Sequence, residues 1–114
     1  MKFKPGVRLK GLVPQMSLAG QVVEEVYREF GLPLVLTSGN DGKHGEGSLH
    51  HCLTGKYTDG QCRANDYRTK YPELNGREQE LRDRVKAALG DDFDVVIEDI
   101  GKDNEHLHVE YDPK

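Results

Sequence analysis

The sequence lacks any apolar run approaching the ~20 residues that a membrane-spanning helix needs. Its mean hydropathy is -0.74, and 35% of its residues are hydrophobic against 32% charged, a balance that suits one small core. The first five residues carry two lysines with no apolar stretch behind them, so we expect neither a secretory signal nor a membrane partner. Repeats and low-complexity tracts are absent as well. We therefore expect residues 1–114 to form a single domain.

Basic residues are fewer than acidic residues. The chain has 16 Lys and Arg against 20 Asp and Glu, a formal net charge of -4 and a pI of about 5.7. Proteins that bind nucleic acids concentrate positive charge on the face that meets the phosphates, and no basic cluster occurs in this sequence. The charge pattern therefore argues against a nucleic-acid partner.

Several catalytic motifs are missing. No His-Glu-x-x-His stretch is present, which excludes the usual helical zinc-protease motif. The absence of Gly-x-Ser-x-Gly argues against a serine nucleophile, and neither of the two cysteines has the context of a cysteine-protease nucleophile. The residues left to carry chemistry are the five histidines: His44, His50, His51, His106 and His108.

Two stretches predict amphipathic helices. The first begins at Ser17, a suitable N-cap, and ends before Gly31. The second runs from Asn75 to about Leu89. Apolar residues recur at helical spacing on one side of each stretch. In the first helix the buried stripe is expected to comprise Leu18, Ala19, Val22, Val23, Val26, Tyr27 and Phe30.

Short strands are expected between and after these helices. Residues 34–37, 63–68 and 93–98 are candidates, and from His106 to Tyr111 apolar and polar residues alternate as in a half-buried strand. Residues 1–16 are expected to be irregular. Because strands and helices do not alternate regularly, the order predicts an α+β fold, a small antiparallel sheet with two main helices.

A zinc site is one interpretation of the histidines. Residues 38–62 form a long glycine-rich stretch, and such stretches in a compact domain are functional or disordered. His50 in this stretch, Asp66 and His108 provide two imidazoles and a carboxylate, and catalytic zinc sites leave the fourth position to water. Glu105, three residues before His108, is a candidate acceptor for the proton of that water. Spacing alone specifies this site only weakly, because histidines near turns are common.

Four separated blocks of the sequence resemble the M15 peptidases, and in particular their small phage-type members. The blocks are Leu36-Thr-Ser-Gly-Asn-Asp-Gly-Lys-His44, Gly47-Ser-Leu-His50, Ala64-Asn-Asp-Tyr-Arg-Thr69 and His106-Leu-His-Val-Glu-Tyr-Asp-Pro113. The family signature is Ser-x-His-x-x-Gly-x-Ala-x-Asp followed by a late Glu/Asp-x-x-His. The resemblance spans roughly residues 4–114. It implies the hedgehog/DD-peptidase fold and a zinc-dependent hydrolase that acts on peptidoglycan peptides.

At the matching positions the resemblance implies that His50, Asp66 and His108 bind Zn²⁺ and that Glu105 is the general base. Asp59 is a second candidate for the carboxylate ligand, but the residues after Asp66 match the family better.

Two further roles stay open. His106 shares a strand face with His108 and would contact the substrate or stabilise the transition state, unless it is simply a solvated histidine. Glu110 competes with Glu105 for the role of base, because strand alternation places Glu110 on the face of His108, whereas the family spacing favours Glu105.

The metal motif departs from the family pattern. His50 and Asp66 are 16 positions apart, against seven in the family, so residues of about 52–61 are interpreted as an insertion. Cys52 and Cys62 bracket it. A disulfide between them would stabilise the fold by ~3 kcal/mol and would suit work outside the cytosol. The alternatives are reduced, packed thiols and a thiolate that joins the metal.

The function implied by the resemblance is that of a phage lysin. A monomeric zinc peptidase would cleave peptidoglycan stem peptides, with the L-Ala–D-Glu bond favoured over a D-Ala–D-Ala terminus. The protein would stay in the cytoplasm until release and then act on the cell wall, or travel with the virion. The alternative is a non-catalytic, zinc-stabilised binding or virion-structural protein of the same fold. Substrate-binding residues are not identified, because Asn40, Asp41 and Lys43 stand where many relatives carry an arginine.

Overall fold

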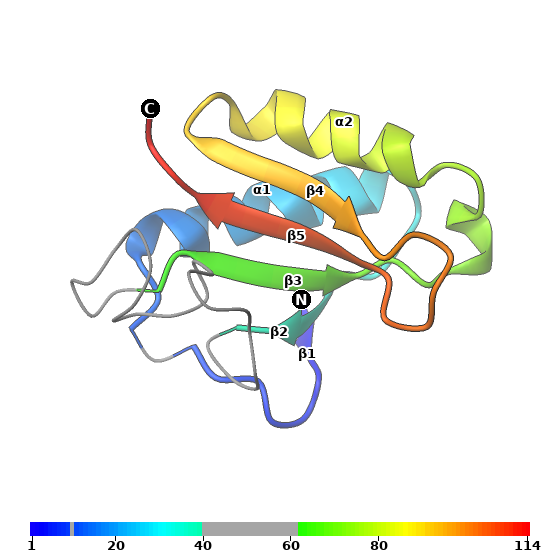
Figure 1. Ribbon diagram of the computed structural model, residues 1–114, viewed down its shortest axis with the longest axis horizontal. Coiled ribbons are helices and arrows are strands. Elements are labelled where there is room, and N and C mark those ends of the chain that lie inside the picture. The colour runs from blue at the N-terminus through cyan, green and yellow to red at the C-terminus, as the bar shows by residue number, and fades with distance from the viewer. Residues whose placement is uncertain (10, 40–61) are drawn as a thin grey trace.

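The computed structural model describes residues 1–9, 11–39 and 62–114, in which two helices lie on one side of a five-stranded sheet (Figure 1). The strand order is β1-β2-β3-β5-β4. The strands are β1 (Lys2–Phe3), β2 (Val35–Ser38), β3 (Ala64–Arg68), β4 (Phe93–Glu98) and β5 (His106–Tyr111). The α+β class predicted from the sequence is confirmed.

The sheet is mixed, not purely antiparallel as predicted. The difference is β1, which pairs in parallel with β2, while the other neighbouring strands are antiparallel. The Lys2 amide donates to the Leu34 carbonyl and the Lys4 amide to the Leu36 carbonyl, each at 2.9 Å. A strand of two residues is too short for any apolar alternation to reveal it, so this part of the chain was expected to be irregular.

Helix α1 (Pro14–Glu29) begins three residues before the expected cap, Ser17. Val13 is the N-cap residue and makes no side-chain cap bond, and Pro14 takes the first helical turn, where its missing N–H costs nothing. The buried face is also rotated relative to the predicted stripe, because Leu18 is 62% exposed. The residues of α1 that are buried are Met16, Ala19, Gly20, Val23, Val26 and Tyr27.

Helix α2 (Glu78–Leu89) begins later than predicted. Residues Pro72–Leu74 form a 3-10 turn, and Gly76 follows with a φ of 79°, so Asn75 does not cap the helix. The predicted end at Gly90 is confirmed, with a φ of 87° that favours glycine. No helix in the described parts of the chain is long and apolar enough to cross a membrane.

The core lies between the two helices and the sheet. Leu107 and Val109 of β5 are fully buried in it, together with Tyr67 of β3 and Leu81 of α2. The predicted alternation in β5 is confirmed. His106, His108 and Glu110 alternate with the buried residues Leu107 and Val109, and therefore point to the other side of the sheet. That side carries the candidate functional site.

A candidate metal centre on the sheet

The register of three strands brings the polar residues together. Asp66 of β3 lies opposite His108 of β5, and Glu98 of β4 lies opposite His106. Directly opposed residues point to the same face of an antiparallel sheet, as do residues two apart on one strand. All four side chains therefore meet on the face away from the helices. We call Asp66, Glu98, His106 and His108 the His–carboxylate cluster.

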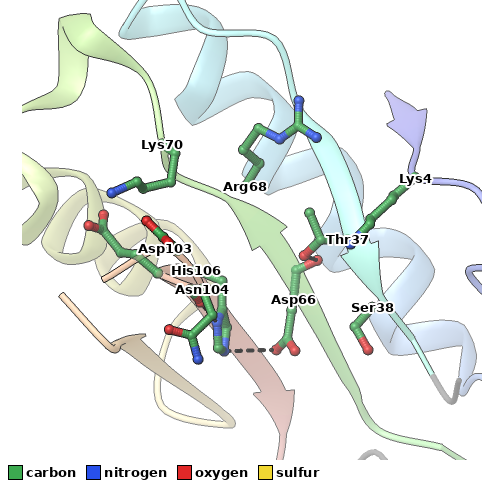
Figure 2. Close-up of a pocket in the computed structure, with 10 residues that line it drawn as sticks. Lys4, Thr37, Ser38, Asp66, Arg68, Lys70, Asp103, Asn104 and His106 are labelled. Atoms are coloured by element: carbon green, nitrogen blue, oxygen red, sulfur yellow. Dashed lines mark hydrogen bonds and ion pairs between the residues drawn. The ribbon is translucent and has the colours of Figure 1, made fainter. Parts of the chain in front are cut away.

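Distances within the His–carboxylate cluster are those of direct contact. The Nδ1 atom of His108 is 2.9 Å from Oδ1 of Asp66, and the Nε2 atom of His106 is 2.9 Å from Oε1 of Glu98. Diagonal separations are longer, 3.7 Å between His106 Nε2 and Asp66 Oδ1 and 3.6 Å between His108 Nδ1 and Glu98 Oε1. Figure 2 shows His106 and Asp66 facing each other.

This geometry fits a metal ion. Each of the four residues offers one ligand atom, and these atoms all lie within 4.8 Å of one another. Ligands ~2.1 Å from a tetrahedral zinc ion are ~3.4 Å apart, and the contacts of 2.9 to 3.7 Å lie on either side of that value. Imidazole nitrogens and carboxylate oxygens suit zinc and several other divalent transition metals. The cluster can therefore hold a metal ion.

The electrostatics of the cluster favour positive charge between the carboxylates. Burial by itself lowers the pKa of His108, but hydrogen bonds to Asp66 and Glu110 outweigh burial and raise this pKa to about 10. Burial also works against the charged form of His106, whose pKa is nevertheless raised by the Asn104 carbonyl and by the carboxylates of Asp66 and Glu98. A metal cation would replace these protons, since ligating imidazoles must be neutral.

A contact at the other ring nitrogen fixes the orientation of each imidazole. Nδ1 of His106 lies 2.7 Å from the Asn104 carbonyl oxygen, so Nδ1 donates a hydrogen bond and Nε2 is left to face the carboxylates or a metal. Nε2 of His108 lies 3.3 Å from Oε1 of Glu110, which leaves Nδ1 facing Asp66. Glu110 thus contacts the ring of His108 on the face that strand alternation predicts.

Glu105 lies beside the cluster but outside it. Its side chain is buried, and the Thr69 hydroxyl donates to its Oε1 at 2.8 Å. The backbone N–H of Gly101 donates to the other carboxylate oxygen at 3.0 Å. These bonds tie the turn before β5 to the end of β3. The predicted role of Glu105 as a general base stays a prediction.

Glu98 is the member of the cluster that the sequence reasoning missed. The signal was present in β4, where Val95 and Ile97 are buried and Glu98 alternates with them. A hairpin of β4 and β5 was foreseeable, but only its register shows that Glu98 lies opposite His106.

Other predicted site residues lie outside the described residues. They are His44, His50, His51, Asp59 and Cys52. Cys62 is buried, and its backbone pairs with that of Leu12. The predicted Cys52–Cys62 bridge stays a prediction, because one of its ends is not described.

A cavity of about 370 Å³ opens beside the cluster (Figure 2). Asp66, Glu105 and His106 line part of it, and three cationic side chains, Lys4, Arg68 and Lys70, also line it. The candidate metal centre therefore adjoins a space large enough for part of a peptide.

Comparison of the chain with protein-family models, with curated proteins and with solved structures finds no match in any of the three. The resemblance to the M15 peptidases therefore depends on the four sequence blocks, and the site must be judged by its own geometry.

Proposed function

We propose that this protein is a zinc-dependent peptidase that hydrolyses an amide bond in peptidoglycan stem peptides. One observation carries the proposal: Asp66 and His108, two of the three ligands implied by the sequence blocks, are in direct contact at 2.9 Å beside a cavity. The L-Ala–D-Glu bond is the favoured target over a D-Ala–D-Ala terminus. In this proposal the protein acts as a monomer on the cell wall after release from the cytoplasm, or from the virion.

Asp66 and His108 would hold the zinc ion, with His50 as the third ligand that the sequence blocks imply. Bound zinc supplies a Lewis acid and lowers the pKa of a water molecule toward ~7. The role of the protein is to hold these ligands rigidly. Adjacent hydrogen-bonded strands carry Asp66 and His108, and the Glu110 carboxylate orients the His108 ring.

The proton acceptor must have a carboxylate oxygen at the cluster. Glu98 meets this condition, because its Oε1 atom faces both histidines and its side chain is 47% exposed. Glu105 meets it less well, because hydrogen bonds from Thr69 and Gly101 engage both of its carboxylate oxygens. Geometry thus favours Glu98, whereas the family spacing favours Glu105, and substitution can separate them.

His106 is placed to act next to the reacting bond. Its Nδ1 hydrogen is held by the Asn104 carbonyl, so the ring is fixed with Nε2 directed at the cluster. The same ring lines the cavity. In this position a protonated His106 can donate a hydrogen bond to an oxygen that gains negative charge during hydrolysis.

One observation favours the second candidate, a zinc-stabilised protein without catalytic activity. The described residues alone offer four ligand atoms, all within 4.8 Å of one another. Structural zinc sites are closed by four protein ligands, whereas catalytic sites leave one position open. If Glu98 and His106 both bind the ion, the protein is a binding or virion-structural protein.

Digestion of purified peptidoglycan by the zinc-loaded protein tests the proposal, with mass spectrometry of the fragments. We expect new L-Ala and D-Glu termini. Glu98→Gln should slow their release about 10²- to 10⁴-fold while zinc stays bound, because the general base is lost. Glu105→Gln is the competing variant, and Glu73→Gln, an exposed residue of the 3-10 turn, is the matched control.

The possible results are distinct. Loss of activity in Glu105→Gln alone would restore Glu105 as the base. Release of D-Ala would show that the protein cleaves the D-Ala–D-Ala terminus instead. No release by the wild-type protein with zinc bound would reject the peptidase and favour the non-catalytic candidate, above all if Glu98→Gln then loses zinc.

A further inference from the structure

Three cationic side chains line the cavity beside the cluster. Lys4 follows β1, Arg68 ends β3 and Lys70 lies two residues further on. In the described parts of the chain, no ion pair joins any of the three to a carboxylate. Arginines on the helices behave differently: Arg28 pairs with Glu25 and Arg84 with Glu29.

The carboxylates that line the same cavity are largely engaged elsewhere. Asp66 contacts the imidazoles of the cluster, and Glu105 accepts hydrogen bonds from Thr69 and Gly101. Asp103 is the third carboxylate of the lining. Three positive and three negative side chains balance, so a divalent ion at the cluster would leave the cavity with net positive charge. Such a cavity attracts an anionic group.

Arg68 is the best placed of the three. It lies two residues from Asp66 on the same face of β3 and directly opposite His106. Successive residues of an extended peptide are ~3.4 Å apart, so a group held by Arg68 would sit one or two residues from a bond at the cluster. The planar guanidinium also matches a carboxylate with two parallel hydrogen bonds.

We propose that this cavity binds the free α-carboxylate of an acidic residue next to the bond that is cleaved, with Arg68 as its main contact and Lys4 and Lys70 beside it. The identity of the peptide rests on the proposed function. In a stem peptide, D-Glu is linked onward through its γ-carboxyl group, which leaves its α-carboxylate free. The protein should therefore distinguish peptides with this carboxylate from peptides in which it is amidated.

The test compares two synthetic L-Ala-γ-D-Glu-L-Lys peptides that differ only in a free or amidated α-carboxyl group of D-Glu. Their dissociation constants are measured by calorimetry on the zinc-loaded protein and on the metal-free protein, where no hydrolysis interferes. We expect the carboxylate peptide to bind at least about tenfold more tightly in both forms, as for a charge-assisted pair. Arg68→Gln should remove most of this preference, and Arg68→Lys should restore part of it.

Arg28→Gln is the matched control, because it makes the same change of charge on helix α1, on the other side of the sheet. It should leave the preference unchanged. Circular dichroism of each variant verifies that it is folded.

Two results would overturn the proposal. Equal binding of the two peptides by the wild-type protein would show that no carboxylate is recognised. A preference that is lost when zinc is removed but survives Arg68→Gln would mean that the metal, and not Arg68, binds the carboxylate. If the preference and its dependence on Arg68 are found but neither peptide is cleaved, the carboxylate site stands and the proposed peptidase function fails.

Discussion

On the helix side of the sheet, β5 contributes Leu107 and Val109, which are fully buried among apolar side chains. On the opposite side the same strand contributes His106 and His108, whose ring nitrogens face carboxylates. The free energy gained by burying apolar side chains depends on the buried area and changes little when atoms shift slightly. Metal affinity, by contrast, depends on a few distances between ligand atoms. One side of the strand therefore belongs to the core and the other side carries the candidate metal centre, and single substitutions should separate the two.

The largest expected effect is loss of zinc on the polar side. Asp66→Ala and His108→Ala should each abolish tight binding, because each removes a ligand atom at the centre of the cluster. Glu110→Gln should weaken binding only about 10- to 100-fold, since Glu110 orients His108 without ligating. Competition with a chromogenic chelator measures all three. Retention of zinc by Asp66→Ala together with its loss in Asp59→Ala would reassign the carboxylate ligand.

The next largest effect lies on the helix side. Leu107→Ala should lower the free energy of unfolding by about 2–5 kcal/mol, because it leaves a cavity in a core where Leu107 is fully buried. Denaturant unfolding of the metal-free protein measures this loss. The folded variant should still bind one equivalent of zinc. Weaker zinc binding by the folded variant would mean that the two sides of β5 are coupled through the backbone.

The sequence was informative where a periodic pattern was enough. The alternation from residue 106 onward placed Leu107 in the core and His108 on the other face, and both helices were found. The predicted caps, Ser17 and Asn75, were wrong, because Pro14 begins α1 and a 3-10 turn precedes α2.

The site was only partly predictable. Asp66 and His108 were expected to meet, and the register of β3 and β5 places them opposite each other. Glu98 was missed because its place opposite His106 depends on how the seven residues between β4 and β5 fold. In that turn Asp99 adopts a φ of 56°, a conformation that few residues other than glycine favour and that periodicity does not reveal.

The ionisation of Tyr67 should show whether water is excluded from the helix side of the sheet. Burial raises the pKa of Tyr67 to about 12, because a buried phenolate loses its hydration, and a hydrogen bond from Asn65 partly opposes this. The unfolded chain releases the proton near pH 10, so the contribution of neutral Tyr67 is complete below pH 10 and is lost as the pH rises through about 12.

Stability should therefore fall by about 1.4 kcal/mol per pH unit for this residue across that interval. Denaturant unfolding at several pH values measures the slope, and tyrosinate absorbance shows whether ionisation accompanies unfolding. Tyr67→Phe should reduce the slope by this amount. An unchanged slope would mean that water reaches the Tyr67 hydroxyl and that the helix side is less dry than its burial indicates.

The smallest effect should come from Leu18, which the sequence pattern placed in the buried stripe of α1. Leu18→Ala should change the free energy of unfolding by no more than about 0.5 kcal/mol, because the side chain is 62% exposed. Val23→Ala, at a fully buried position of the same helix, should cost about 2 kcal/mol. Thermal or denaturant unfolding of the two variants gives the comparison directly. Equal losses would mean that Leu18 is buried by a contact in solution. Leu18 lines an apolar groove together with Phe93, so such a contact would lie in that groove, next to the core between the helices.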